Sequence, residues 1–219
     1  MSDVRRLILC EGDEDVSFLR HFLSSRGIAG FDVDRPKPGE AAGSGAFQRR
    51  LEVLVAATAL DAKDFRIEDL QELIVVADND DDPASAFRNV RTQIRDAGYG
   101  DPQRPRDPVR AADRPQTRIL MLPWDDERGG LETLCLAAVL DARPYLRECV
   151  DEYVRCTKFS RADSIKGAKM RLRCSLSAAC EQEPNVALTY VWNDRHRELN
   201  LVPLDHSCFD RIEEFFRGL

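Results

Sequence analysis

Histidine, paired cysteines and long apolar runs are scarce in this sequence, and each absence excludes a class of protein. The 219 residues include three dispersed histidines and seven cysteines, none of which forms a Cys-x-x-Cys pair. A structural zinc site normally needs closely spaced ligand pairs, so we do not expect one in this sequence. No apolar run approaches the roughly 20 residues of a membrane-spanning helix, and the charged start MSDVRR lacks the apolar core of a signal peptide. We therefore expect a cytoplasmic protein with reduced cysteines.

The charge is unevenly distributed along the chain. The net charge of −7 argues against a simple basic nucleic-acid-binding protein. Between Asp61 and Asp82, nine acidic residues stand against two basic ones, whereas between Asp151 and Ser175 seven basic residues stand against three acidic ones. An acidic focus and a basic face on one small protein suggest a bound cation and an anionic partner.

Short apolar runs alternate with helical patterns four times before residue 142. Apolar runs without alternation indicate strands that are buried on both faces, and apolar residues three and four apart indicate amphipathic helices. The order of these patterns predicts an α/β fold with a parallel four-stranded sheet and helices on both faces. We expect strands at 6–10, 31–35, 73–77 and 119–122, and helices at 13–26, 47–60, 83–97 and 131–140.

The second half of the chain has a different character. Residues 98–117 contain four prolines and predict a long loop. From residue 143 onward the pattern is mainly helical, with one hairpin-like stretch around residues 187–202. We accordingly divide the chain into an α/β domain at 1–142 and a mainly helical C-terminal extension at 143–219 that packs on it. The extension could also form an oligomer contact, supply the substrate-facing basic surface or contact a protein partner.

Acidic clusters follow two of the expected strands. Glu11 ends the first strand, and the run Asp78-Asn79-Asp80-Asp81-Asp82 ends the third. If these strands are parallel neighbours, their acids reach one edge of the sheet, where such folds bind ligands. Asp78 and Asp80 then point to one side and can share a cation, while Asn79 faces away. Because converging carboxylates repel one another, and because all-oxygen ligands suit Mg²⁺ or Mn²⁺, we expect such an ion here.

Both clusters also have a purely structural interpretation. Asp82 can serve as the N-cap of the helix that starts at Pro83. The acids at positions 13–15 can simply favour the positive end of the first helix. The functional interpretation is supported by the fact that both clusters directly follow apolar strands.

The motifs around the two clusters resemble the Toprim domain over roughly residues 5–140. The resemblance rests on Glu11-Gly12 after a strand, on Asp15 and Phe18 in the next helix, and on Asp78-x-Asp80-x-Asp82 after a later strand. Topoisomerases, bacterial primases, ribosomal-RNA maturases, recombination proteins and overcoming-lysogenization-defect nucleases share this fold. The chain is most similar to small stand-alone prokaryotic Toprim-like proteins of unassigned function. In those proteins a later strand leads into a turn and a helix start much like the segments 122–125 (LPWD) and 130–132 (GLE).

The resemblance implies roles for the strand-end acids. Glu11 would be the general acid/base or a metal ligand, and Asp78 and Asp80 would bind Mg²⁺, with Asp82 as a weaker contributor. Phosphodiester cleavage needs neutralisation of the scissile phosphate and an activated water, and metal ions supply both.

Further candidates lie outside the two clusters. Asp125 and Glu132 are candidates for additional metal ligands, although a turn residue and a helix-start acid would explain them equally well. Lys166 and Lys169 are candidates for a catalytic contact with the phosphate or the leaving group. The alternative for these two lysines is a solvated helix face.

The length of the chain narrows the function within this group. A topoisomerase needs a nucleophilic tyrosine on a separate domain, and a primase needs template-binding and zinc modules, for which there is no room. We therefore expect a small Mg²⁺-dependent nuclease that acts on DNA or RNA, in defence or RNA processing. The alternative is a non-catalytic binding or regulatory module on the same scaffold, which acts with a partner in DNA metabolism or defence. A phosphotransfer receiver is set aside, because the strand that ends in Leu122-Pro123 lacks the required lysine.

Overall fold

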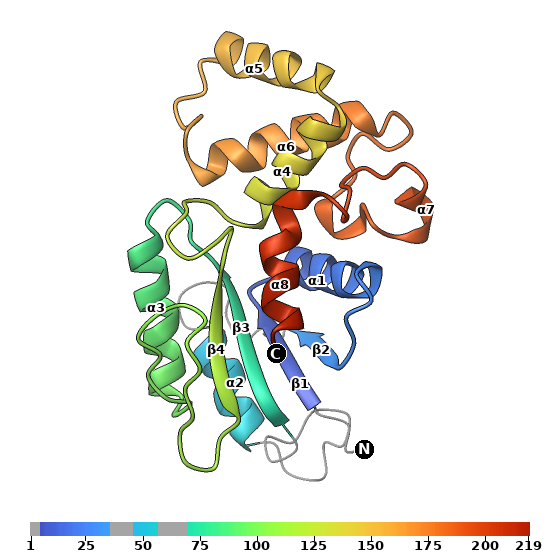
Figure 1. Cartoon of the computed structure of the whole chain (residues 1–219). Coiled ribbons are helices and arrows are strands. Elements are labelled where there is room, and N and C mark those ends of the chain that lie inside the picture. Colours follow the sequence, from blue (N-terminus) through green and yellow to red (C-terminus); the bar gives the residue numbers. More distant parts are fainter. Residues whose placement is uncertain (1–4, 36–45, 57–69) are drawn as a thin grey trace.

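Four parallel strands form the sheet that organises the molecule. The computed structural model describes residues 5–35, 46–56 and 70–219. Within these residues the strand order is β2-β1-β3-β4, and every neighbouring pair is parallel. Helices lie on both sides of the sheet, so the expected α/β class is confirmed (Figure 1). The elements are β1 (Arg5–Cys10), α1 (Asp13–Ser25), β2 (Phe31–Asp34), α2 (Ala46–Ala56), β3 (Leu70–Asp78), α3 (Pro83–Asp96), β4 (Gln116–Leu122), α4 (Leu131–Ala142), α5 (Tyr145–Thr157), α6 (Ile165–Ala179), η2 (Leu188–Tyr190), α7 (Asp194–Arg197), η3 (Ser207–Phe209) and α8 (Asp210–Arg217).

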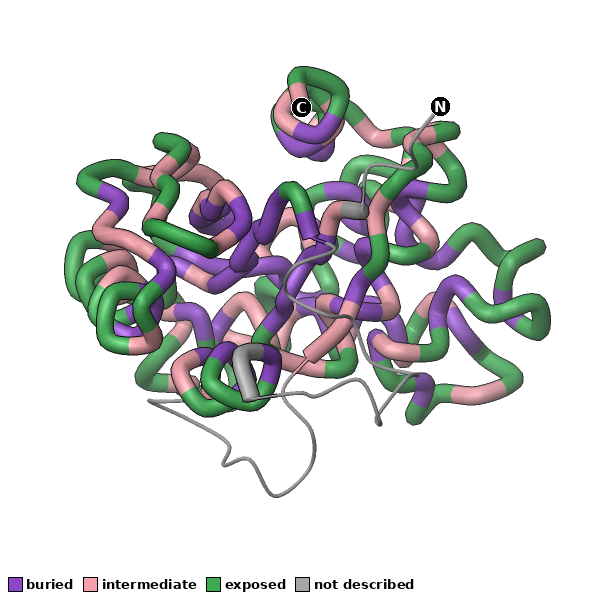
Figure 2. Tube along the Cα trace, turned by 90° about the horizontal axis from the view of Figure 1, so that it is seen from below, coloured by how far each residue is buried: buried purple, intermediate pink, exposed green. Residues whose placement is uncertain are grey.

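The strand side chains divide between two apolar layers. Leu7 and Leu9 of β1 pack in the layer that contains α2 and α3, whereas Ile8 and Cys10 pack in the layer that contains α1 and α8. Figure 1 shows α2 and α3 on one side of the sheet and α1 and α8 on the other. Buried positions gather in the middle of the molecule, and the helices turn exposed positions outward (Figure 2). Because both faces of the sheet are covered at its centre, β1 and β3 carry apolar runs without alternation, whereas the edge strand β2 alternates.

Three helices stand beyond the carboxyl ends of the strands. Figure 1 shows α4, α5 and α6 in this position. α4 packs against α6, and Val139 of α4 and Leu176 of α6 belong to the same apolar cluster as Leu122 at the end of β4. The first turn of α4 and one face of α6 therefore border the edge of the sheet at which the strand-end acids lie.

The segment from residue 187 to residue 202 is not a hairpin, so that prediction is wrong. The chain there forms the short helices η2 and α7. The indole N–H of Trp192 donates to the carbonyl oxygen of Val202 at 3.2 Å, and its ring lies 5.7 Å from the ring of Phe18 in α1. The apolar residues of this segment are thus buried by packing on α1 rather than by strand pairing.

Part of the expected pattern lies outside the described residues. This applies to residues 57–60 of the helix expected at 47–60 and to four members of the acidic focus, Asp61, Asp64, Glu68 and Asp69. Within the described ranges, none of the helices has the length and apolarity that crossing a membrane requires.

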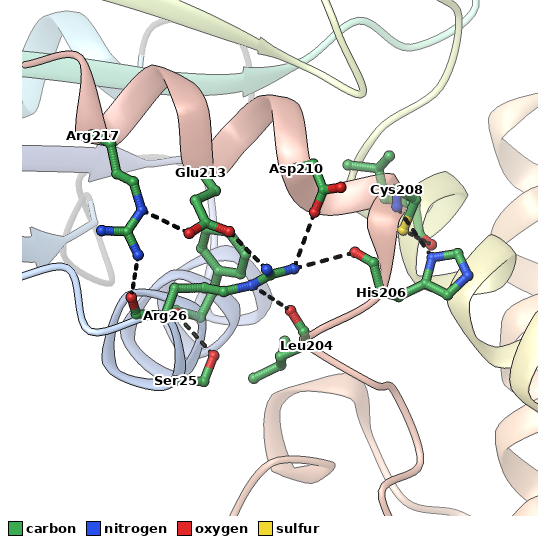
Figure 3. Close-up of polar contacts among 10 residues, drawn as sticks. Ser25, Arg26, Leu204, His206, Cys208, Asp210, Glu213 and Arg217 are labelled. Carbon is green, nitrogen blue, oxygen red and sulfur yellow. Dashed lines mark hydrogen bonds and ion pairs between the residues drawn. The ribbon is translucent and has the colours of Figure 1, made fainter.

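Arg26, which directly follows α1, forms hydrogen bonds and an ion pair with the C-terminal segment. Its Nε donates to the carbonyl oxygen of Leu204 at 3.1 Å, and its Nη1 lies 2.7 Å from Oε2 of Glu213 in α8. Its guanidinium carbon lies 5.7 Å from the centre of the Phe22 ring. Arg217 returns a hydrogen bond of 2.6 Å to the carbonyl oxygen of Arg26. Figure 3 shows the Arg26 guanidinium in contact with Leu204, Asp210 and Glu213, and Arg217 in contact with the backbone of Arg26.

Replacing Arg26 by alanine is expected to lower the free energy of unfolding by about 2 kcal/mol, because several charge-assisted contacts are lost and Glu213 keeps only Arg217. Urea denaturation measures this change. The control is Arg147→Ala, which removes an ion pair with Asp141 between two half-exposed side chains and should change stability by less than about 1 kcal/mol. Equal losses in the two variants would contradict the anchoring role of Arg26.

Candidate functional site

The register of the sheet brings Glu11 and Asp78 together. Cys10 of β1 pairs with Val76 of β3, so the next residues of both strands emerge at the same carboxyl edge. The backbone N–H of Asp78 donates a hydrogen bond to the carboxylate of Glu11. The expectation that two separate strands deliver acids to one point is therefore met for this pair.

Two helix starts add carboxylates to the same point. Asp15 lies in the first turn of α1, where its Oδ2 accepts the N–H of Gly12 at 3.0 Å, and Glu132 lies in the first turn of α4. The charges of both residues act on Asp78. We refer to these four carboxyl groups, Glu11, Asp15, Asp78 and Glu132, as the acid cluster.

Burial and neighbouring charges make Glu11, Asp15 and Asp78 difficult to ionise. Burial, followed by the charges of Asp15 and Asp80, raises the pKa of Glu11 to about 7. Burial also raises the pKa of Asp15 to about 7, and the charge of Glu132 adds to this effect. Glu11 nevertheless remains exposed to solvent. Two groups of the acid cluster thus have pKa values near neutrality, where they can gain or lose a proton.

Asp78 is held by the start of α4. Its Oδ1 accepts the backbone N–H of Leu131 at 3.0 Å, and a Cβ atom on Gly130 would lie 2.3 Å from its carboxyl carbon. Burial, followed by the charges of Asp15 and Glu132, raises the pKa of Asp78 well above its usual range. The glycine before α4 therefore provides the space in which this carboxyl group sits.

Lys169 of α6 brings a positive charge to the acid cluster. Its Nζ lies 3.1 Å from Oε1 of Glu132. Burial alone would lower the pKa of Lys169, but the charges of Glu132 and Asp78 raise it. Oε2 of Glu132 is buried and has no hydrogen-bond partner among the described residues. One lysine against this many carboxyl groups leaves part of their negative charge uncompensated.

The loop after β3 is tied to its surroundings at three points. Asn79 is fully buried and donates from Nδ2 to the carbonyl oxygens of Trp124 and Glu127, at 3.0 and 2.7 Å. Asp82 accepts the N–H of Ser85 at 3.1 Å and so caps α3. In addition, Oδ1 of Asp81 accepts the N–H of Ile165 at 2.8 Å. Because Ile165 is the first residue of α6, Asp81 links the acidic loop to the helix that carries Lys169.

The remaining candidates have other surroundings. Arg106 donates two hydrogen bonds to Asp125, at 3.0 and 2.5 Å, so the charge of this carboxylate is compensated there. Lys166 is exposed and makes no hydrogen bond or ion pair with any residue of the described ranges. Asp80 is also exposed, with a φ of 51°, and its charge acts on Glu11. The structure thus brings together Glu11, Asp78, Asp80, Glu132 and Lys169, and it places Asp82, Asp125 and Lys166 in other contacts or in solvent.

Sequence reasoning missed Asp15 and Asp81 as parts of this site. Asp15 was matched to a family motif, but its position in a helix start also fits a simple interaction with the helix dipole. The available signal was its place three residues after Gly12, from which an acid can accept the N–H at a helix start. No local signal pointed to Asp81, since its partner lies 84 residues away.

The carboxyl groups are not arranged as a ready metal-binding group. Across residues 5–35, 46–56 and 70–219, no set of three or more His, Cys, Asp or Glu side chains is placed so that it could hold a metal ion. The site in its present arrangement is therefore a crowded acidic edge with a lysine beside it.

The fold and the site together define an α/β protein. Its parallel sheet and the starts of α1 and α4 bring a group of acidic side chains close to Lys169 of α6. A family model described as "Protein of unknown function (DUF3226)" matches residues 5–219, so the chain belongs to this family. The match includes the sheet, the acid cluster and the C-terminal helices. No curated protein and no solved structure matches the chain.

Proposed function

We propose that this protein hydrolyses phosphodiester bonds in DNA or RNA with the help of Mg²⁺ or Mn²⁺. The observation that carries the proposal is the acid cluster beside Lys169, in which the pKa values of Glu11, Asp15 and Asp78 are raised. Carboxyl groups crowded in this way are stabilised either by protons or by a hard cation. The resemblance of the Glu11-Gly12 and Asp78-x-Asp80-x-Asp82 motifs to the Toprim domain supports a metal-dependent reaction on nucleic acid.

The chemistry of the donors fits a hard cation. The acid cluster offers only carboxylate oxygens, and the buried Oε2 of Glu132 has no other partner among the described residues. Asp78, Asp80 and Glu132 would hold the ion. Asp82 and Asp125 are the weaker candidates, because Asp82 already caps α3 and Asp125 already pairs with Arg106. When bound, a divalent cation would supply neutralisation of the charge on the scissile phosphate and activation of a water molecule.

Other side chains of the site would transfer the proton, contact the phosphate and hold the site in place. Glu11 reaches solvent and has a pKa near 7, which suits a group that takes up and returns a proton. Lys169 can direct its charge to a phosphate oxygen when it leaves Glu132. Asp15 keeps the start of α1 in place through its hydrogen bond with Gly12.

The test is a cleavage assay with single- and double-stranded DNA and RNA in Mg²⁺ or Mn²⁺. Glu11→Gln and Asp78→Asn are each expected to lower the initial rate at least about 100-fold, because each removes a carboxylate that the reaction uses. Asp126→Asn, which removes an exposed carboxylate two residues after Trp124, is expected to retain the wild-type rate. Cleavage that persists unchanged in both Glu11→Gln and Asp78→Asn would refute the proposal.

One observation favours the alternative of a non-catalytic binding or regulatory module. The carboxyl groups of the described residues are not placed as a ready metal site. Under this alternative the wild-type protein leaves every substrate intact with either metal, and Asp78→Asn weakens binding to a DNA-metabolism or defence partner. We also propose a cytoplasmic location, which is supported by the seven free cysteines.

A further inference from the structure

A pocket of about 320 Å³ opens beside the acid cluster. Its walls come from α1, α4, α6 and the segment 184–188. Glu132 and Lys169 line this pocket and also form the ion pair at the candidate site, so the two regions are continuous. A volume of this size lies at the lower end of the range that small-ligand sites occupy.

The walls of the pocket combine three kinds of chemistry. Glu14 and Glu132 provide carboxylates, and Lys169 and Arg173 of α6 provide cations. Leu172, Leu176, Val186 and Leu188 provide an apolar surface. Glu132 is more than nine-tenths buried, and its Oε2 lacks a hydrogen-bond partner within the described part of the chain. A ligand that combines an anionic group, an apolar face and a hydrogen-bond donor would match these walls.

A second cavity, of about 350 Å³, continues from this pocket along α6. It is lined by Lys166, Lys169, Met170, Arg173 and Cys174, and it shares Lys169 and Arg173 with the first. These positions recur at intervals of three and four residues, so they form one face of the helix. The cationic surface thus extends from Lys169, beside the acid cluster, to Lys166 in the first turn of α6.

We propose that the pocket holds one unpaired nucleotide of a single-stranded nucleic acid and that this face of α6 carries the adjoining phosphates. The inference deepens the proposed function, from which it takes the class of substrate. A nucleotide combines the required features: its phosphate matches Lys169 and Arg173, the flat faces of its base match the aliphatic wall, and the N–H groups of its base edge match Glu132.

This assignment limits the form of the substrate. A base that is paired and stacked in a duplex cannot enter a pocket of this kind unless it is first extruded, and extrusion costs a few kcal/mol. Single strands and frayed ends offer an unpaired base without that cost. Phosphates elsewhere on the strand would be repelled by the acid cluster and attracted by Lys166 and Arg173, which fixes the path of the strand over α6.

The test compares binding of a short labelled single strand with binding of the blunt duplex of the same sequence, by fluorescence anisotropy in EDTA at low salt. Ala187 is exposed and lines the pocket, so Ala187→Trp fills it from the open side. The wild-type protein is expected to bind the single strand at least about tenfold more tightly than the duplex. Ala187→Trp is expected to weaken single-strand binding about tenfold and duplex binding less than about twofold.

Two further variants make the result decisive. Ser177→Phe fills the pocket from α6 instead and is expected to have the same effect as Ala187→Trp. Ala178→Trp makes a matched exchange at the next position of α6, which is exposed and outside the pocket, and should bind like the wild type. Equal binding of single strand and duplex, or single-strand binding that survives both pocket-filling variants, would overturn the inference. Because the assay needs no hydrolysis, a protein that binds as expected but never cleaves would contradict only the proposed function.

Discussion

In EDTA at pH 8, the Asp78→Asn variant is expected to melt at a higher temperature than the wild-type protein, by roughly 5 °C. Asp78 is half-buried, lies near Asp15 and Glu132, and has a pKa well above its usual range. An ionised carboxyl group at this position therefore destabilises the metal-free fold. Asparagine keeps the shape and can still accept the N–H of Leu131, but it removes the charge.

Because folding raises the pKa of Asp78, the stability gained by Asp78→Asn depends on pH in a defined direction. A carboxyl group whose pKa is raised by folding binds its proton more tightly in the folded state, so stability falls as pH rises above the pKa of the unfolded chain. The gain from Asp78→Asn should accordingly be small near pH 4 and grow toward pH 8. Calorimetry at both pH values measures it, and the exposed Asp126→Asn is the control that makes the same change in net charge. A gain that is absent at pH 8, or as large at pH 4, would contradict the electrostatic account.

A single methyl group on Gly130 is expected to disable the site. The Cβ of alanine would lie 2.3 Å from both the carboxyl carbon and Oδ2 of Asp78, far inside van der Waals contact. The backbone of Gly130 is extended, with a φ of −164°, so the clash and not the backbone is the cause. We expect Gly130→Ala to lose about 1–3 kcal/mol of stability, as in other overpacked positions. We also expect its cleavage rate to fall at least about 100-fold, because Asp78 must leave the start of α4.

Two companion variants test this explanation. Gly12→Ala adds the same methyl group at the other helix start of the site, where the nearest atom would be Oδ2 of Asp15 at an ordinary 3.7 Å, so it should be tolerated. Adding Asp78→Ala to Gly130→Ala removes the atoms that clash and should recover stability but not cleavage. Melting curves and initial rates report the two effects. If the double variant is no more stable than Gly130→Ala, the clash with Asp78 is not the source of the loss.

Much of the fold could be predicted from the sequence, because local patterns determine it. Apolar runs without alternation marked strands such as β1 and β3, which are covered on both faces. Helical spacing marked the helices between them, and the order of strands and helices predicted the parallel sheet. The hairpin expected at 187–202 was wrong because a long-range contact decides this segment: Trp192 packs on Phe18 of α1, and no local pattern records such a contact.

For the candidate site, the sequence alone determined which acids end β1 and β3, since residues that follow buried strands of a parallel sheet must meet at one edge. Only the tertiary structure decided what those acids encounter there. It placed the starts of α1 and α4 against Asp78, set Lys169 beside Glu132, and paired Asp125 with Arg106. These contacts join residues far apart in the chain, and their strength depends on burial. Local spacing encodes neither property, and for that reason the raised pKa values and the pocket along α6 became visible only in the folded molecule.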